Sequence, residues 1–350
     1  MVRKYREETY VLTERENYLR LLRGEHPEWV PVSRFGRSKI DGSPPPTQGV
    51  LCTPLFGHMA VPGKAVDIWG VTFVSSEEAA GGKLPEPNNF ILEDICDWGD
   101  VIKAPNLDDI DWEAAAKKDL ARVNREESVI VLHTFNGLFQ TLVSYMGFEG
   151  ALMAMLTDPD EVKALFEYLT NFYVACYEKL LDAYKPDVMG FCEDNAAWKS
   201  PFFSLEMYRD LYKPFTKRLA QPVLDRGIFI DMHDCGHCEI FVDEWQDYDV
   251  RSWNPAQSCN DVLGIKQRYG RKLVIIGGSD FSGEMLDPDY PEEKIKEAVI
   301  RTIDTYAPGG AYVFAGGFLG PIGDEVTARK NRWIAEAAEP YCRDFYKTHG

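Results

Sequence analysis

Ile228-Phe229-Ile230-Asp231-Met232-His233-Asp234-Cys235 is an apolar run that ends in an imidazole and a thiol two residues apart. Such a run predicts a buried β-strand. Side chains alternate across a strand, so His233 and Cys235 should project from the same face at its end. One rigid element can supply two ligands of a soft-to-borderline metal such as zinc in this way. The stretch therefore predicts half of a metal site.

Short apolar runs of the same kind recur along the chain, and amphipathic segments separate most of them. The predicted strands are residues 30–35, 129–133, 188–192, 228–232, 250–253, 273–277 and 311–314. The predicted helices are residues 14–22, 160–183, 205–225, 292–306 and 325–346. Alternating strand and helix patterns indicate parallel βαβ units. With an eighth strand expected within residues 60–85, the pattern favours a barrel over an open sheet.

Polar side chains follow the predicted strands one after another. They are His133, Glu193, Asp194, Asn195, His233, Cys235, Asn254, Gln257, Ser279 and Asp280. A (β/α)8 barrel gathers its chemistry at the carboxyl ends of all its strands, whereas a doubly wound sheet uses one crevice. We therefore expect the α/β class, with a single (β/α)8 TIM barrel domain over residues 1–350 and an N-terminal extension. Residues 36–128, rich in Pro and Gly, should form long loops over the C-terminal mouth.

The composition excludes several classes of protein. Hydrophobic residues make up 45% of the 350 residues, enough for a large core. The net charge of −18 argues against a nucleic-acid surface, which needs clustered Lys and Arg. No apolar stretch is long enough for a membrane span, and the first residues lack the apolar core of a signal peptide. With eight cysteines expected to be reduced, the chain is predicted to be cytoplasmic. Its acidic surface is compatible with a homodimer.

The segment 233–239, His-Asp-Cys-Gly-His-Cys-Glu, concentrates metal-binding residue types at the strand end. This density favours metal binding over separate structural roles. His233 and Cys235 are the preferred ligands. Cys238 forms a Cys-x-x-Cys with Cys235, but we expect it one turn into the following helix, so it is the second choice. The Cys-x-x-Cys is not repeated, which argues against a structural four-cysteine zinc site.

A third ligand is expected from the end of the preceding strand, which reads Phe191-Cys192-Glu193-Asp194. Glu193 is preferred, because Cys192 would alternate to the other face of a regular strand. The alternative is that Glu193 and Asp194 only cap the next helix or pair with basic side chains.

Two further strand ends and a set of aromatic residues are candidates for a binding pocket. The stretches 253–257 and 277–280 carry Asn, Gln, Ser and Asp, which can hydrogen-bond a polar substrate. Turn formation and helix capping explain the same residues equally well. The aromatic candidates are Trp69, Phe73, Phe135, Phe139, Trp198 and Trp253. Most aromatic residues in a chain of this size belong to the core.

The order of several short motifs resembles that of the uroporphyrinogen decarboxylase superfamily. The motifs are residues 13–25 with Pro27 and 29–32; residues 67–71; Ser200-Pro201 with Tyr208 and Pro214; His233-x-Cys235-Gly236; and Tyr269-Gly270 with Gly277-Gly278-x-Asp280. Each is loose by itself, but their succession is specific. The similarity covers nearly the whole chain and implies one (β/α)8 domain.

Within that superfamily the chain resembles the zinc-dependent methyltransferases that work with corrinoid proteins, whose His-x-Cys matches His233 and Cys235. True uroporphyrinogen decarboxylases carry Arg-Gln-Ala-Gly-Arg after the first strand. Here residues 33–38 read Ser-Arg-Phe-Gly-Arg-Ser, which keeps Arg34 and Arg37 but breaks the pattern. The methyltransferases usually add a late cysteine, which residues 315–321 around Gly317 lack. A site of His, Cys and Glu is harder, and better suited to polarising an oxygen.

The resemblance implies the methyltransferase component of an O-demethylase. Such an enzyme passes a methyl group from a methoxylated donor, aromatic ones included, to a corrinoid protein docked over the barrel mouth. Zinc would be held by Glu193, His233 and Cys235, which are the expected catalytic residues. The expected substrate contacts or proton donors are His133, Asn195, Trp253 and Asp280. The alternatives are a metal-free decarboxylase, a non-catalytic corrinoid- or tetrapyrrole-binding protein, and thiol or amine methyl transfer, which the missing cysteine disfavours.

Overall fold

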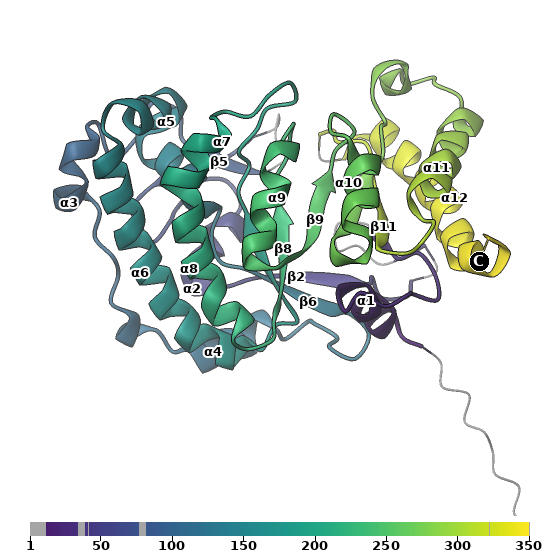
Figure 1. Cartoon of the computed structure of the whole chain (residues 1–350), viewed down its shortest axis with the longest axis horizontal. Coiled ribbons are helices and arrows are strands. Elements are labelled where there is room, and N and C mark those ends of the chain that lie inside the picture. Colours follow the sequence, from purple (N-terminus) through teal and green to yellow (C-terminus); the bar gives the residue numbers. More distant parts are fainter. Residues whose placement is uncertain (1–11, 34–38, 41, 77–81, 322, 350) are drawn as a thin grey trace, which may run out of the picture.

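Eight parallel strands form the centre of the molecule and curve into a nearly closed barrel (Figure 1). The computed structural model describes residues 12–33, 39–40, 42–76, 82–321 and 323–349. The barrel strands are β1 (Val32–Ser33), β2 (Thr47–Leu51), β6 (Val129–His133), β7 (Val188–Cys192), β8 (Phe229–His233), β9 (Val250–Ala256), β10 (Val274–Gly278) and β11 (Tyr312–Ala315). Neighbours in this order from β2 to β11 pair in parallel, and β11 pairs with β1. Within the described residues no ladder joins β1 to β2. The predicted α/β barrel is confirmed.

Helices follow most of the strands and surround the barrel in Figure 1. The α-helices are α1 (Glu14–Leu22), α2 (Thr53–Phe56), α3 (Trp98–Val101), α4 (Trp112–Asp119), α5 (Gly137–Thr157), α6 (Pro159–Tyr184), α7 (Leu205–Met207), α8 (Lys213–Leu224), α9 (Val242–Trp245), α10 (Val262–Tyr269), α11 (Glu292–Tyr306) and α12 (Glu325–His349). A π-helical turn, η4 (Tyr208–Tyr212), joins α7 to α8. The 3-10 turns are η1 (Gly57–Ala60), η2 (Ile95–Asp97), η3 (Leu107–Asp109), η5 (Glu239–Phe241), η6 (Gln246–Tyr248), η7 (Gly270–Lys272) and η8 (Gly283–Leu286). In the described part of the chain, none of the helices combines the length and apolarity needed to cross a bilayer.

Local chemistry explains where several helices begin. The Thr13 hydroxyl accepts a hydrogen bond from the backbone N–H of Glu16 at the start of α1. The Asp111 carboxylate does the same for Ala114 in α4. Such capping satisfies an N–H that has no partner inside the helix. The predicted helix over residues 14–22 is therefore confirmed in both type and bounds.

The core has two layers, one inside the barrel and one between the strands and the helices. Inside, Val129, Val188 and Val274 stand at the first positions of β6, β7 and β10. They pack in one cluster with Tyr18 and Leu22 of α1. Helix α1 thus closes the end of the barrel at which the strands begin. The larger outer layer joins the strands to the surrounding helices.

The eighth barrel strand is β2, so the prediction that it lies within residues 60–85 is wrong. Residues 60–85 instead contain a separate antiparallel sheet of β3 (Ala65–Val66), β4 (Thr72–Ser75) and β5 (Lys83–Pro85). The sequence of β2, Thr-Gln-Gly-Val-Leu, is too polar to stand out as a barrel strand. Its identity comes from its pairing with β6, which is a non-local property.

Two further predictions are not tested by the structure. Arg34 and Arg37 lie outside the described residues. The prediction that residues 1–350 form a single domain stays a prediction.

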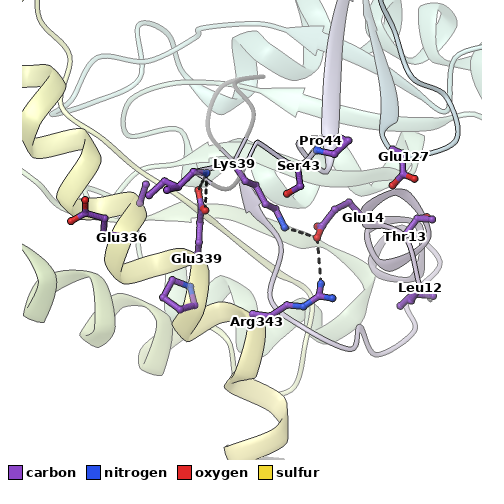
Figure 2. A pocket seen from close by; sticks show the side chains of 13 residues that line it. Leu12, Thr13, Glu14, Lys39, Ser43, Pro44, Glu127, Glu336, Glu339 and Arg343 are labelled. Atoms are coloured by element: carbon purple, nitrogen blue, oxygen red, sulfur yellow. Dashed lines mark hydrogen bonds and ion pairs between the residues drawn. The ribbon is translucent and has the colours of Figure 1, made fainter. Parts of the chain in front are cut away.

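A cavity of about 670 Å³ lies between α1, α12 and the chain after β1 (Figure 2). On one side of it, Glu14 of α1 forms ion pairs with Lys39 and with Arg343 of α12. The second carboxylate oxygen of Glu14 accepts a hydrogen bond from Nε1 of Trp29, at 3.2 Å. These contacts tie the first and last helices together.

Candidate metal centre

The ends of β7 and β8 bring a thiol and an imidazole to the same face of the sheet. Cys192 and His233 are the last residues of these two strands and stand opposite each other in the parallel register. Residues in register on neighbouring strands project to the same side. A ligand atom of each, together with a carboxylate oxygen of Asp194, lies within 4.8 Å of the others.

Asp194 joins this group because the chain turns sharply after β7. Its backbone is left-handed, with φ of +49°, which few residues other than Gly, Asn and Asp adopt readily. Its Oδ1 lies 3.6 Å from Nε2 of His233 and accepts a hydrogen bond from the backbone N–H of Cys235 at 3.1 Å. Its Oδ2 lies 3.8 Å from Sγ of Cys192. The carboxylate therefore touches both strand ends.

Cys235, in the loop after β8, lies beside this group, since its Sγ is 3.5 Å from Nε2 of His233. The predicted pairing of these two side chains is thus seen in the structure. We call the four residues the ligand cluster: Cys192, Asp194, His233 and Cys235. Burial, with the charge of Asp194 next, raises the pKa of the Cys192 and Cys235 thiols above the ordinary thiol value. Both thiols therefore keep their protons until something such as a metal ion displaces them.

The geometry does not bring Glu193 into the ligand cluster. The argument from alternation that preferred it over Cys192 is wrong, because it is Cys192 that shares the face of His233. The Glu193 carboxylate points the other way, where it accepts hydrogen bonds from Nδ2 of Asn195 at 2.9 Å and from the hydroxyl of Thr216 at 3.4 Å. Burial raises the pKa of Glu193 to about 8. Glu193 thus belongs to a buried network behind the ligand cluster.

Asn195 and Trp253, both predicted to contact substrate, are buried in that framework. The backbone N–H of Asn195 donates to Oδ1 of Asp234 at 2.8 Å, and its side chain bridges Glu193 and Asp234. Nε1 of Trp253 donates to the carbonyl of Asp234 at 3.2 Å. Neither side chain is accessible, at 0% exposure each. Both therefore hold the two ligand loops together rather than facing a substrate.

Neither His133 nor Asp280, the other predicted substrate contacts, belongs to the ligand cluster. Asp280 is exposed, and its carboxylate accepts a hydrogen bond from Ser282. His133 lines a cavity of about 680 Å³ inside the barrel, together with Asp231 and Asn254. Burial, followed by the charge of His233, lowers the pKa of His133 to about 4, so its imidazole is neutral at pH 7.

Glycine on the neighbouring strand makes the room for this imidazole. A Cβ at Gly190 of β7 would lie 2.4 Å from Cε1 of His133, well inside contact distance. A second glycine is required after Cys235. Gly236 has φ of +82°, and a Cβ there would lie 2.4 Å from the carbonyl oxygen of Ala196. Two glycines thus permit the close packing of the strand ends.

Cys238, the second choice as a ligand, is buried, and its thiol donates to the carbonyl of Asp234 at 3.3 Å. Gln257 accepts a hydrogen bond from the backbone N–H of Gly236 at 2.6 Å. Nδ2 of Asn260 donates to the carbonyl of Gly236 at 2.9 Å. The loop after β9 therefore holds the loop that carries Cys235 in place. Gln257 thus has a structural role, rather than the substrate contact that was its other predicted role.

The ligand cluster opens onto a cavity of about 660 Å³ with aromatic walls. His233, Cys235 and Asp194 form one part of its lining, and Phe135 with the start of α5 forms another. The small sheet β3–β5 and its neighbouring turns supply a third part, which includes His58, Trp69, Phe73 and Lys83. Of the predicted aromatic candidates, Trp69, Phe73 and Phe135 line this cavity. Phe139 and Trp253 are core residues, and Trp198 is exposed.

The chemistry of the ligand cluster, and the two distances measured from His233, fit a zinc ion. Ligands bonded tetrahedrally to zinc at their usual lengths stand roughly 3.3–3.8 Å apart. Nε2 of His233 lies 3.5 Å from the sulfur of Cys235 and 3.6 Å from the oxygen of Asp194. Sulfur, imidazole and carboxylate are also the three ligand types that zinc accepts. The sequence offers Cys192 and Asp194 as candidates at this strand end, but alternation favours Glu193 over them. No local pattern in the sequence indicates this set, because it depends on the register that places Cys192 opposite His233.

These features define an α/β-barrel protein with a sulfur-, nitrogen- and oxygen-containing site at the carboxyl ends of its strands. A family model described as uroporphyrinogen decarboxylase (URO-D) matches residues 80–323. The chain belongs to the uroporphyrinogen decarboxylase family.

Comparison with solved structures gives a protein that shares the fold over nearly the whole chain. A methyltransferase from Methanosarcina mazei has a TM-score of 0.63 at 15% identity, over 96% of this chain and 100% of that one. A B12-independent methionine synthase from Shewanella sp. W3-18-1, in complex with selenomethionine, has a TM-score of 0.47 at 11% identity, over 79% of this chain and 75% of that one. At 15% identity the likeness to the Methanosarcina mazei protein shows the fold alone. No curated protein matches the chain.

Proposed function

We propose that this chain is a zinc-dependent methyltransferase that moves a methyl group from a methoxylated aromatic donor to a corrinoid carried by a partner protein. The observation that carries the proposal is the convergence of the ligand cluster at the wall of an aromatic cavity. Membership of the uroporphyrinogen decarboxylase family supports a substrate site at the barrel mouth. The similarly folded protein from Methanosarcina mazei is itself described as a methyltransferase.

In this proposal the ligand set differs from the one expected from sequence. His233 offers Nε2, Asp194 a carboxylate oxygen, and Cys192 and Cys235 their sulfurs, while Glu193 stays behind them in its buried network. When bound, zinc would supply a Lewis acid for the negative charge that develops on the leaving oxygen. A set that includes a carboxylate is harder than an all-thiolate site, so an oxygen-bound methyl group suits it better than a thiol.

The cavity walls provide what an aromatic donor needs from the protein. Trp69, Phe73 and Phe135 present apolar surface to the cavity. A flat ring packed among them is held with its methoxy group toward His233 and is shielded from water. The corrinoid partner would reach this group from the open side of the barrel mouth. Substrate contacts by His133 and Asp280 stay predictions.

Decarboxylation is the second candidate, because the matching family model is described as a decarboxylase. A decarboxylase of a polycarboxylate would need cationic groups in the cavity to bind several carboxylates. The described lining of the cavity contains one lysine and no arginine. Two thiols beside an imidazole also have no evident part in that reaction. These observations favour methyl transfer.

Metal analysis with an activity assay tests the proposal. We expect the purified protein to bind about one zinc per chain, and His233→Ala and Cys235→Ala to lose it. His237→Ala is the matched control, since this imidazole lies outside the ligand cluster and contacts the Lys199 carbonyl. The zinc-loaded protein should transfer methyl groups from methoxylated aromatics to cob(I)alamin. Full zinc retention in both variants would refute the metal site. Loss of carbon dioxide from a porphyrinogen by zinc-free protein would establish the decarboxylase instead.

A further inference from the structure

A buried lysine lines the same cavity as the ligand cluster. Lys83 is the first residue of β5 and is only 7% exposed. Its ammonium donates a hydrogen bond to the carbonyl of Gly63. Within the described part of the chain no carboxylate pairs with it, although ion pairs are frequent elsewhere on this acidic protein. Burying an ammonium without a counter-charge costs free energy. An anion bound next to the Lys83 ammonium would offset this cost.

The described groups that neighbour Lys83 do not supply that anion. His58 lies beside Lys83, and burial together with the charge of Lys83 lowers the pKa of its imidazole to about 4. Its Nε2 has no hydrogen-bond partner among the described residues. Asp67 also lines this cavity, but its Oδ1 accepts hydrogen bonds from the backbone N–H groups of Trp69 and Val71, at 2.9 and 2.8 Å, and no ion pair joins it to Lys83 within the described residues. Among the described residues, Lys83 thus has no counter-charge and Nε2 of His58 has no hydrogen-bond partner.

We propose that Lys83 binds a carboxylate of the substrate, so that the donor is an anionic aromatic methyl ether rather than a neutral one. The inference rests on the proposed function and names its substrate class. The ring lies among Trp69, Phe73 and Phe135, the methoxy group faces the ligand cluster, and the carboxylate faces β5. A cavity of about 660 Å³ accommodates a substituted benzoate. An ammonium–carboxylate contact away from water is one of the stronger polar contacts in proteins.

The test compares two ligands that differ in charge, 4-methoxybenzoate and 4-methoxytoluene, by calorimetric titration. We expect the wild-type protein to bind the benzoate at least about tenfold more tightly. Lys83→Met, which keeps the apolar stem, should lose this preference and bind the neutral ether unchanged. Lys83→Arg should retain part of it. The matched control is Lys64→Met, because Lys64 lies next to the same small sheet but is exposed and pairs with Glu86.

Three outcomes would overturn the proposal. The first is equal binding of the benzoate by wild type and Lys83→Met. The second is an equal loss of both ligands in Lys83→Met with a lower unfolding temperature, which would make Lys83 only a support for Gly63. The third is a preference for the benzoate that persists in Lys83→Met but disappears when the metal is chelated. That result would show that the metal, and not Lys83, binds the carboxylate. Binding is measured without methyl transfer, so an inactive protein that shows the expected preference would refute the proposed function and leave Lys83 as an anion site.

Discussion

Oδ1 of Asp194 lies 3.6 Å from Nε2 of His233, so the acid that follows β7 and the imidazole that ends β8 share one site. The left-handed backbone at Asp194 makes this contact possible. It reverses the direction of the chain, so that Asp194 faces the site while Glu193, one residue earlier, faces the core. The ligand cluster therefore depends on a single backbone conformation as much as on residue type.

Replacing the two adjacent acids separates their roles. We expect Asp194→Asn to lower zinc affinity about tenfold or more, because the amide keeps an oxygen for the Cys235 N–H but loses the charge. Glu193→Gln should keep its zinc, because its carboxylate bonds Asn195 and Thr216 instead. Competition with a chelating dye measures both affinities. If Glu193→Gln lost its zinc while Asp194→Asn kept it, Glu193 and not Asp194 would be the ligand.

Gly190→Ala should destabilise the barrel through His133. The added methyl would stand 2.4 Å from Cε1 of the imidazole, and such overpacking costs about 1–3 kcal/mol. In a His133→Ala background the same change should cost much less, because the clashing ring is gone. Urea unfolding of the four proteins in the cycle gives the coupling free energy. Equal costs in both backgrounds would show that the two side chains are not in contact.

Asp67 should make the stability depend on pH in a defined direction. Burial raises the pKa of Asp67 to about 6 in the folded protein, above the unfolded value of roughly 3.9. The folded state therefore holds this proton more tightly, and the stability it contributes is present below about pH 4 and is lost as the pH rises through about 6.

Asp67→Asn isolates this effect. Both backbone N–H groups donate to Oδ1, which an amide retains. Relative to the variant, the wild-type free energy of unfolding should fall by about 1–3 kcal/mol between about pH 4 and about pH 7. Urea unfolding at several pH values measures the difference. A constant difference across this range would mean that the carboxyl titrates alike in the folded and unfolded chain.

Removing Glu14 should loosen the junction of α1 and α12 (Figure 2). Its side chain is only 10% exposed and pairs with Lys39, which is 14% exposed. Glu14→Ala leaves that ammonium unpaired, so we expect a loss of about 2–4 kcal/mol in the free energy of unfolding. Glu16→Ala on the same helix is the control. Glu16 is 31% exposed, and an exposed pair is worth less than about 1 kcal/mol. Similar losses for both variants would contradict a special role of Glu14.

The pairing of His233 with Cys235 was predictable because it depends on one short segment. An apolar run predicts a strand, and alternation places residues two apart on one face. The other ligands depend on the register between β7 and β8, which is formed by residues far apart in the chain. Alternation within one strand therefore predicts the wrong face for Cys192. Asp194 needed a turn conformation that its residue type permits but does not impose.

The amino-acid sequence by itself determined the α/β class, seven of the eight barrel strands and the segment that carries the imidazole and a thiol, because these follow from local patterns of apolar side chains. Only the tertiary structure decided which segment forms the eighth barrel strand and which acid faces His233. It also decided that Lys83 lines the same cavity as the ligand cluster. These depend on hydrogen-bonded register and on the packing of the small sheet β3–β5 at the barrel mouth. Both bring together residues that no local pattern relates.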